Sequence, residues 1–415
     1  MASLRIGLIG AGRIVPAHLY GYAELRRAGI DDFRITAICS RDPARARLLL
    51  AADSAERSST PWRYGDPLTT QSITVADFQD DVEPAIFTDV QAMLDAGVVD
   101  AVDISTEVAL HHTQVVQCLQ AGVHVLVEKP MAITIRAARM MVEAAHRTGR
   151  QLAVTEHARY LRQARLAAWL VGRGDLGAPQ MLSWPSIGTR FWSPDRWVGH
   201  SSWRHRRLIG AGGASLDIGP HIFHRVRALC GEVETVSALA RVLEPVRYLR
   251  DAGGEMLDTV EADADDAFMA LATFASGVIG QLSYSFAGHG EPSIPPGPTL
   301  YGSRGSISGD RVVLDGQEPT TLDAHWERHG AADAARVFPH GLSDPFGLLI
   351  GDWLAAIREN RPAETSGDEG LRDLAASFAI VESSLAGRTI ALGDVLDGTV
   401  DAYQRDLDEH YGLRA

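Results

Sequence analysis

The chain has 415 residues, 46% of them hydrophobic, which is enough for two domains with cores of their own. Its net charge of −14 argues against a nucleic acid or an anionic membrane as partner, because both attract basic surfaces. The three cysteines are scattered, no signal peptide is recognisable and no apolar run reaches the length of a membrane span. We therefore expect a cytoplasmic protein.

The first part of the chain alternates strand and helix patterns. Strands are predicted at 5–9, 34–39, 101–105 and 123–128, with helices at 14–28, 43–52, 88–96 and 109–121. This alternation predicts an α/β domain over residues 1–130, a doubly wound parallel sheet with helices on both faces. Residues 54–85 interrupt the rhythm with Ser, Thr, Asp and Pro, and we expect a surface insertion there.

After Pro130 the pattern changes. Two helices at 133–148 and 161–173 flank a strand at 151–155. Strands then dominate at 233–242, 264–274, 277–286 and 311–314, and helices close the chain at 345–359 and 368–386. We expect residues 131–415 to form an α+β domain with a large, mostly antiparallel open sheet and helices on one side.

A glycine-rich turn follows the first predicted strand. Gly10 and Gly12 let the backbone approach a pyrophosphate at the start of the next helix, near Arg13 and Ile14. Val15 occupies the place of the third glycine of the usual pattern, and an ordinary strand–turn–helix would also use such a turn. Its position in the first strand–helix unit of a parallel sheet favours a Rossmann domain that binds a dinucleotide.

The residues after the second predicted strand bear on which dinucleotide binds. An acidic residue there would accept hydrogen bonds from the ribose hydroxyls of NAD. Ser40 and Arg41 instead offer a small donor and a cation suited to a 2′-phosphate, so NADP is favoured over NAD. Arg41 could also be a solvated loop residue. Asp42 is interpreted as the cap of the helix that begins at Pro43.

Three polar residues suggest proton transfer. Lys129 follows the end of a parallel strand, where ligands bind in such sheets, although a lysine there could simply lie at the surface. Asp217 and His221 are four residues apart and would share a helix face, and the imidazole suits proton exchange near neutrality. His224 follows one turn later. A metal site built from these residues is the rival interpretation, but hydride transfer needs no metal and we predict none.

Aromatic residues gather before this helix. Trp184, Trp192, Trp197 and Trp203 are interleaved with arginines and a histidine. Aromatic faces stack on sugar rings while cations bond hydroxyls, which favours a bulky carbohydrate such as a glycoside. Packing beneath the loop or an oligomer contact would explain any one of these tryptophans equally well.

Together these residues resemble the glucose–fructose oxidoreductase/inositol dehydrogenase (Gfo/Idh/MocA) family. The resemblance spans most of the chain. It rests on the motifs Gly10-Ala11-Gly12, Ser105-Thr106 with His111, Glu128-Lys129-Pro130, Arg159-Tyr160, Trp203-Arg204, and Gly212-Gly213-Ala214 with Asp217 and His221. Glu107-Val108 departs from the Pro-Asn that this family carries, which puts the cofactor contacts there in doubt.

The resemblance implies an NAD(P)-dependent dehydrogenase or reductase acting on a secondary alcohol or ketone of a sugar, glycoside or cyclitol. Lys129 and His221 would handle the hydroxyl proton, and Asp217 would orient His221 or the substrate. The cofactor contacts would be Gly10, Gly12, Arg13, Ile14, Ser40, Arg41, Ser105, Thr106, His111, Glu128 and Lys129. The substrate contacts would be Arg159, Tyr160, Trp192, Trp203, Arg204 and His224. The C-terminal sheet would build a homo-oligomer, a dimer or tetramer.

Two alternatives remain open. A glycosidase-like enzyme could oxidise a ring carbon transiently with a bound, recycled NAD, and would then show no net cofactor reduction. A non-catalytic, cofactor-sensing relative would need no proton relay, and the presence of Lys129, Asp217 and His221 disfavours it.

Overall fold

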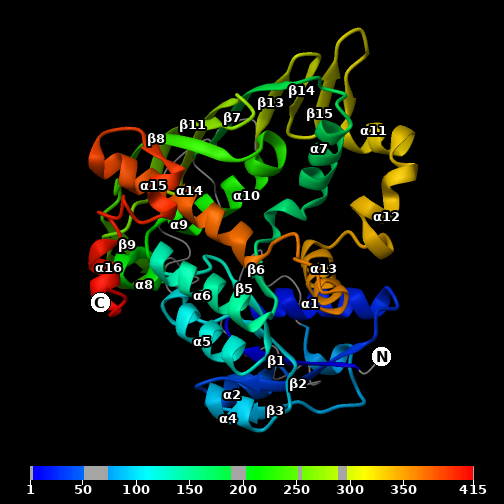
Figure 1. Cartoon of the computed structure of the whole chain (residues 1–415), viewed down its shortest axis with the longest axis vertical. Coiled ribbons are helices and arrows are strands. Elements are labelled where there is room, and N and C mark those ends of the chain that lie inside the picture. The colour runs from blue at the N-terminus through cyan, green and yellow to red at the C-terminus, as the bar shows by residue number, and fades with distance from the viewer. Residues whose placement is uncertain (1–2, 51–72, 188–201, 251–254, 288–296, 415) are drawn as a thin grey trace. The chain divides into compact units, whose positions relative to one another are not determined.

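The computed structural model describes residues 3–50, 73–187, 202–250, 255–287 and 297–414 (Figure 1). They form two compact units. The first comprises Met1–Ala132, Ala137–Tyr160 and Phe338–Gly370, and the second Ile133–Arg136, Leu161–Val337 and Leu371–Ala415. Within the described residues, no helix is both long and apolar enough to span a membrane.

The first unit is built on a six-stranded sheet in the order β3-β2-β1-β4-β5-β6, and every pair in it is parallel. The strands are β1 (Leu4–Ile9), β2 (Phe33–Cys39), β3 (Ala85–Phe87), β4 (Ala101–Ile104), β5 (His124–Glu128) and β6 (Leu152–Thr155). The predicted parallel α/β sheet is confirmed. The strand order reverses at β1, so the turns after β1 and β4 open toward the crevice where such sheets bind ligands.

Helices of the first unit follow the predicted segments closely. They are α1 (Val15–Arg27), α2 (Pro43–Leu48), α4 (Val90–Asp95), α5 (Val108–Gln120), α6 (Ile135–Thr148) and α13 (Pro345–Glu359), with short 3₁₀ turns η2 (Val75–Asp77) and η3 (His157–Arg159). The Asp42 side chain accepts a hydrogen bond from the Ala44 N–H, which confirms it as the cap of α2. Helices α1 and α13 pack closely, since a Cβ added at Gly21 would lie 2.8 Å from Phe346.

The first unit extends beyond the expected division at residue 130. β6 pairs with β5 and so completes the parallel sheet, and the Val154 N–H donates to the Thr365 carbonyl. The described end of the expected surface insertion is also partly buried. The Gln79 side chain, 6% exposed, hydrogen bonds to both the N–H and the carbonyl of Ile35. It thereby satisfies backbone groups of β2 next to the short strand β3.

The second unit contains a nine-stranded sheet in the order β16-β15-β14-β13-β7-β12-β11-β8-β17. Its strands are β7 (Pro179–Ile187), β8 (Val233–Arg241), β11 (Ala267–Phe274), β12 (Ile279–Ser285), β13 (Thr299–Gly302), β14 (Gly305–Ser308), β15 (Arg311–Leu314), β16 (Thr320–Thr321) and β17 (Ile390–Ala391). Only β7 and β12 pair in parallel, so the predicted mostly antiparallel sheet is confirmed. β9 (Val246–Arg250) and β10 (Met256–Glu261) form a separate hairpin.

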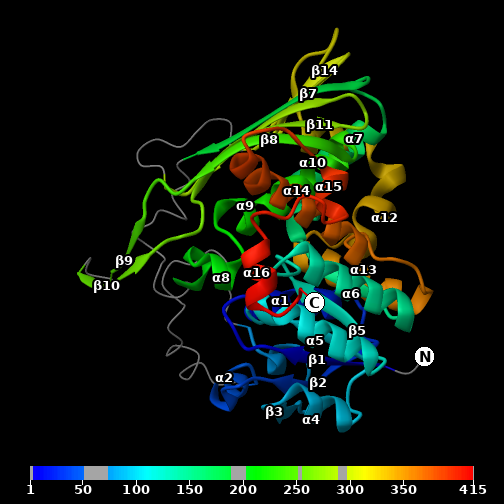
Figure 2. The same cartoon turned by 60° about the vertical axis from the view of Figure 1, so that its left-hand side comes forward.

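Helices of the second unit gather on one side of this sheet, as Figures 1 and 2 show for α10, α14 and α15. They are α7 (Arg162–Gly172), α8 (Arg207–Gly210), α9 (Ala214–Asp217), α10 (Gly219–Cys230), α11 (Leu322–His329), α12 (Ala334–Val337), α14 (Gly367–Ala386), α15 (Leu392–Leu396) and α16 (Arg405–His410), with 3₁₀ turns η6 (Ser202–His205) and η7 (Ala331–Asp333). The 3₁₀ turn η8 (Pro339–Gly341) belongs to the first unit. The burial of β11 alternates accordingly: Phe268 and Ala270 are buried, whereas Met269 and Leu271 are exposed.

Candidate active site

The glycine-rich turn after β1 has the geometry of an anion cradle. Gly10 has a φ of 109°, and a Cβ added there would lie 2.7 Å from the Ser105 carbonyl oxygen. Only glycine fits that position without strain. Ile14, the residue before α1, gives the helix no side-chain cap. The positive end of α1 therefore faces the turn without a competing acceptor from Ile14, which fits the pyrophosphate of a dinucleotide.

Ser40 and Arg41 lie just after β2. Ser40 is 9% exposed and its Oγ accepts the Asp42 N–H at 3.3 Å, so it shapes the turn. The side chain of Arg41 is 81% exposed, and its Nη2 lies 3.4 Å from Oε1 of Glu107, which follows β4. The cation expected to meet a 2′-phosphate thus already has a carboxylate beside it.

His111 contacts two loops of the first unit, the one after β4 and the one after β5. Its Nδ1 lies 3.1 Å from the Pro130 carbonyl oxygen and its Nε2 lies 3.2 Å from the Thr106 carbonyl oxygen. The ring is 1% exposed, and burial lowers its pKa. Thr106 donates its hydroxyl to Gln114 at 2.6 Å. His111 therefore ties the turn after β4 to the residue that follows Lys129.

Glu128 and Lys129 stand at the carboxyl end of β5. The Lys129 side chain is half-buried, and the peptide bond to Pro130 is cis. One oxygen of Glu128 accepts the Lys129 N–H at 3.0 Å, and the other lies 2.9 Å from Nε2 of His18 on α1. Nδ1 of His18 in turn faces the Asp103 carboxylate of β4.

Neither His18 nor Asp103 was predicted from the sequence as part of this site. A signal existed, because Asp103 is a carboxylate within the apolar strand Ala101-Val102-Asp103-Ile104, and a buried acid of this kind requires a partner.

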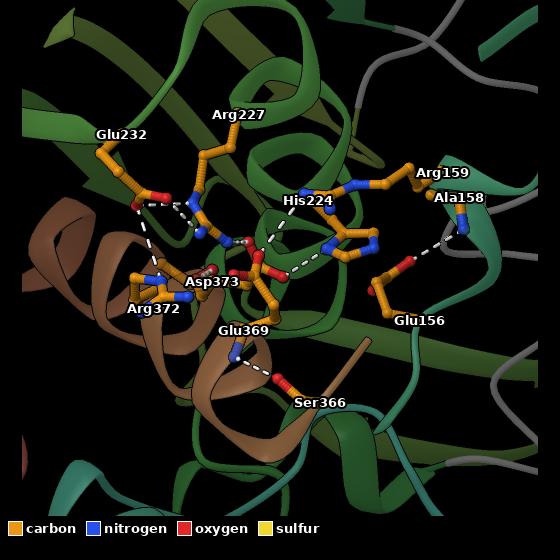
Figure 3. Close-up of polar contacts among 11 residues, drawn as sticks. Glu156, Ala158, Arg159, His224, Arg227, Glu232, Ser366, Glu369, Arg372 and Asp373 are labelled. Atoms are coloured by element: carbon orange, nitrogen blue, oxygen red, sulfur yellow. Dashed lines mark hydrogen bonds and ion pairs between the residues drawn. The ribbon is translucent and has the colours of Figure 1, made fainter. Parts of the chain in front are cut away.

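Arg159 and Tyr160 follow β6. Figure 3 shows Arg159 directed at Glu369, and the two form an ion pair of 3.7 Å. The Tyr160 hydroxyl donates to Asp352 at 3.2 Å, and the side chain is 1% exposed. Both residues are thus fixed by acidic groups of the same unit.

In the second unit, Asp217 and His221 belong to two successive helices. Asp217 ends α9 and His221 lies in the first turn of α10, so the single helix expected from their spacing is interrupted at Ile218. Pro220 explains the break, because it has no N–H to donate back to residue 216.

The glycine-rich segment before α9 is fixed by one buried acid. Asp265 accepts the N–H of Gly213 at 3.1 Å, the N–H of Ser215 at 2.9 Å and the Ser215 hydroxyl at 2.8 Å. Burial raises the pKa of Asp265. A Cβ added at Gly213 would lie 1.6 Å from the Asp265 carbonyl oxygen, so this close approach requires glycine.

Arg204 joins two of the predicted site residues. Its Nε lies 3.5 Å from Oδ2 of Asp217, and its guanidinium lies 4.3 Å from the ring centroid of Trp203. The structure thus brings the adjacent residues Trp203 and Arg204 together with Asp217, which lies further along the chain.

His224 is fully buried, with Nδ1 2.6 Å from Oδ2 of Asp373. Arg227 approaches the other oxygen of Asp373 at 2.6 Å and also pairs with Glu232, as Figure 3 shows. His224 would therefore act on a substrate only through other groups.

Of the other three tryptophans predicted to meet the substrate, the structure describes only Trp184. Trp184 is 8% exposed and packs under the guanidinium of Arg225, which lies 4.8 Å from its ring centroid, so its surroundings are those of a core residue. Trp192 and Trp197 lie outside the described residues.

Two family models match this chain. Residues 4–156 match the model described as "Oxidoreductase family, NAD-binding Rossmann fold", and residues 164–308 match the "GFO/IDH/MocA C-terminal domain". This chain belongs to the Gfo/Idh/MocA oxidoreductase family. The family predicted from the sequence motifs is confirmed.

Curated relatives span nearly the whole chain. Levoglucosan dehydrogenase of Pseudarthrobacter phenanthrenivorans is 28% identical over 412 residues, which cover 92% of this chain and 97% of that enzyme. D-apiose dehydrogenase of Paraburkholderia graminis is 28% identical over 403 residues, which cover 93% and 88% of the two chains.

A solved structure of levoglucosan dehydrogenase with NADH and L-sorbose is similar with a TM-score of 0.74 and 22% identity, covering 94% of this chain and 99% of that one. At this identity the likeness shows the shared fold.

Proposed function

We propose that this protein is an NAD(P)-dependent dehydrogenase or reductase that transfers a hydride between nicotinamide and a secondary alcohol or ketone of a sugar, glycoside or cyclitol. Membership in an NAD-binding oxidoreductase family supports the cofactor class. Relatives named for dehydrogenation of levoglucosan and apiose support the carbohydrate substrate.

One observation carries the assignment of the proton-transfer group. Lys129 is the only lysine of the chain, whereas the other 38 of its 39 basic residues are arginines. An arginine remains charged at any physiological pH, but an amine can gain and lose a proton. The single position that holds an amine stands at the carboxyl end of a parallel strand, where ligands bind in such sheets.

The bound nicotinamide would supply the hydride donor or acceptor. Lys129 and His221 take up or deliver the proton of the reacting hydroxyl, since general acid–base groups must reach that oxygen. Asp217 orients His221 or the sugar, and Arg204 holds Asp217 by their ion pair. Arg159, Tyr160, Trp192 and Trp203 are proposed as further sugar contacts, whereas the fully buried His224 would affect the sugar only through other groups.

NADP is the proposed preference over NAD. Ser40 and Arg41 occupy the position after β2 where an NAD-binding domain would present an acid. The Glu107 carboxylate opposes this preference, because it lies beside Arg41 and would repel a 2′-phosphate bound there. Arg41 must therefore exchange Glu107 for the phosphate when NADP binds.

The exposed face of the nine-stranded sheet is proposed to bind a second copy of the chain. Large apolar side chains on five adjacent strands are each at least 50% exposed on this face: Met181, Leu239, Met269, Leu271, Ile279 and Tyr301. Their cross-strand neighbours include uncharged Ser237 and Gln281. Two chains of net charge −14 repel each other, so a neutral apolar face is the surface on which they can meet.

The function is tested by assaying sugars, glycosides and cyclitols for reduction of NAD or NADP. The best substrate is then used to measure kcat of the Lys129→Ala and His221→Ala variants. Each substitution should lower kcat by about 10²- to 10⁴-fold, the usual contribution of a positioned acid or base, with cofactor affinity changed only a few-fold. Because both residues serve one transfer, the double variant should lose little more than either single one.

A Lys129→Ala enzyme with the wild-type rate would refute the assignment. Product formation from glycosides without net nicotinamide reduction would establish the recycled-cofactor mechanism instead.

A further inference from the structure

A histidine outside the proposed catalytic set lies between two buried carboxylates. Nδ1 of His18 is 2.8 and 3.0 Å from the oxygens of Asp103, and its Nε2 is 2.9 Å from Oε1 of Glu128. The side chains of His18 and Asp103 are 1% and 2% exposed. A neutral imidazole has one N–H, so donating to both acids requires the imidazolium. Burial opposes that charge, but Asp103 and Glu128 outweigh it and raise the pKa of His18 to about 10.

This network reaches the catalytic candidate through Glu128. His18 holds one oxygen of the Glu128 carboxylate, and the other oxygen accepts the backbone N–H of Lys129 at 3.0 Å. At the opposite end, the Tyr22 hydroxyl donates to Asp103 at 3.2 Å. A continuous chain of hydrogen bonds therefore runs from α1 through β4 to the residue that ends β5.

The surroundings of His18 make this connection strong. Phe346 of α13 lies against the imidazole, with ring centroids 5.2 Å apart, and His157 stacks on Phe346 at 5.0 Å. Besides His18, the network contains three ionisable groups, those of Asp103, Glu128 and Tyr22. Hydrogen bonds between charged groups are shorter and stronger where water is excluded.

We propose that His18 is a positioning residue: it fixes the Glu128 carboxylate, which in turn holds the backbone of Lys129 and sets where its amine stands. The inference rests on the proposed function of Lys129 as a proton-transfer group. It differs from a purely structural role, in which His18 would only neutralise Asp103 and Glu128.

Two substitutions at His18 separate these roles. His18→Gln places an amide N–H near the position of Nε2 and keeps a donor for Glu128, whereas His18→Asn places one near Nδ1 and keeps a donor for Asp103 only. We expect His18→Asn to lower kcat at least tenfold at unchanged sugar KM, and His18→Gln to stay within about threefold of wild type. Equal kcat values in the two variants would overturn the proposal.

The unique lysine gives a direct readout. Reductive methylation with ¹³C-formaldehyde labels the Lys129 amine as the only side-chain amine of the chain. Its methyl resonance should move in His18→Asn and stay near its wild-type position in His18→Gln. An unchanged resonance in both variants contradicts the inference. NADH binding, followed by its fluorescence, checks that the cofactor cradle is intact in each variant.

Controls separate the possible failures. His325 of α11 is also a buried histidine, and it pairs with Asp175 at 2.9 Å. His325→Asn should therefore lower the stability of the protein about as much as His18→Asn does, without changing kcat. If Lys129→Ala retains activity, the proposed function itself fails. If Lys129→Ala is inactive but the two His18 variants turn over equally, only the inference fails.

Should a His18 variant not fold, Glu128→Gln supplies the second test, because an amide has one acceptor oxygen in place of the two that face His18 and the Lys129 N–H. We then expect the Lys129 methyl resonance to move and kcat to fall at least tenfold, and an unchanged resonance would reject the proposal.

Discussion

Nε of Arg204 lies 3.5 Å from Oδ2 of Asp217, while the same guanidinium covers the Trp203 ring. One cation thus links an aromatic face to an acid of the proposed site. Arg204→Met keeps an unbranched stem over Trp203 but removes the charge next to Asp217. We predict a rise in sugar KM of about tenfold, because removing the cation of a partly buried ion pair destabilises the position of the Asp217 carboxylate. Steady-state kinetics measure this.

Arg206, an exposed neighbour in the same segment, offers the matched control. Arg206→Met should leave KM unchanged. If both substitutions raise KM equally, the effect comes from the general charge of the segment and not from the pair with Asp217.

The contact between Arg41 and Glu107 predicts opposite effects on cofactor choice. Arg41→Ala should weaken NADP binding by about 1.5–3 kcal/mol, the scale of a hydrogen bond to a charged group, and leave NAD nearly unchanged. Glu107→Gln should tighten NADP binding, since it frees Arg41 from a competing carboxylate. Fluorescence titration gives both dissociation constants. Equal losses for the two cofactors in Arg41→Ala would contradict the assignment.

The exposed sheet face predicts the oligomeric state. Leu271 of β11 is 62% exposed, and a glutamate there would place a charge within the contact. Leu271→Glu should shift the wild-type oligomer to monomers in light scattering. Leu385→Glu is the control, because Leu385 is 61% exposed but belongs to helix α14 and not to a strand of this face. A monomeric wild-type protein would reject the interface.

His124 predicts a loss of stability in mild acid. Its Nδ1 accepts the Gln151 N–H at 2.9 Å, and burial together with Arg150 lowers its pKa to about 4. The unfolded chain, with a histidine pKa of about 6.5, binds the proton first as pH falls. Stability from His124 is therefore complete above pH 6.5 and lost as pH falls to about 4.

Thermal unfolding between these pH values tests this point. His124→Asn keeps an acceptor for the Gln151 N–H but does not titrate, so its melting temperature should fall less with acid than that of the wild type. His340→Asn replaces an exposed histidine whose φ of 57° asparagine tolerates, and it should follow the wild-type curve. Parallel curves for the wild type and His124→Asn would contradict the prediction.

Strands with short apolar runs bounded by glycine or polar residues were predictable from the sequence. β1, β2, β4 and β5 each lie within one residue of the predicted bounds, because β-branched runs carry a strong local signal. β7 was missed, since Pro179 and Pro185 fall within it and proline ordinarily argues against a strand inside a sheet. β3 was missed because three residues carry no periodicity.

The site residues also differ in whether a local sequence pattern could predict them. Lys129 and the segment of Asp217 were visible as local motifs, next to a strand end and a glycine-rich segment. The network of His18, Asp103 and Glu128 was not, because it depends on β4 and β5 being neighbours and on the face that α1 presents. The prediction that Asp217 and His221 share one helix was wrong, because Pro220 separates α9 from α10.

Residues 338–370 complete the unit that begins at the N-terminus, and this bears on how the chain matures during translation. Helix α13 covers α1, and the segment at 365–366 pairs with β6. A ribosome exposes β1 through β6 long before it makes these residues. The apolar surface of α1 that α13 covers in the folded unit therefore stays exposed to water and to chaperones until most of the second unit has been synthesised.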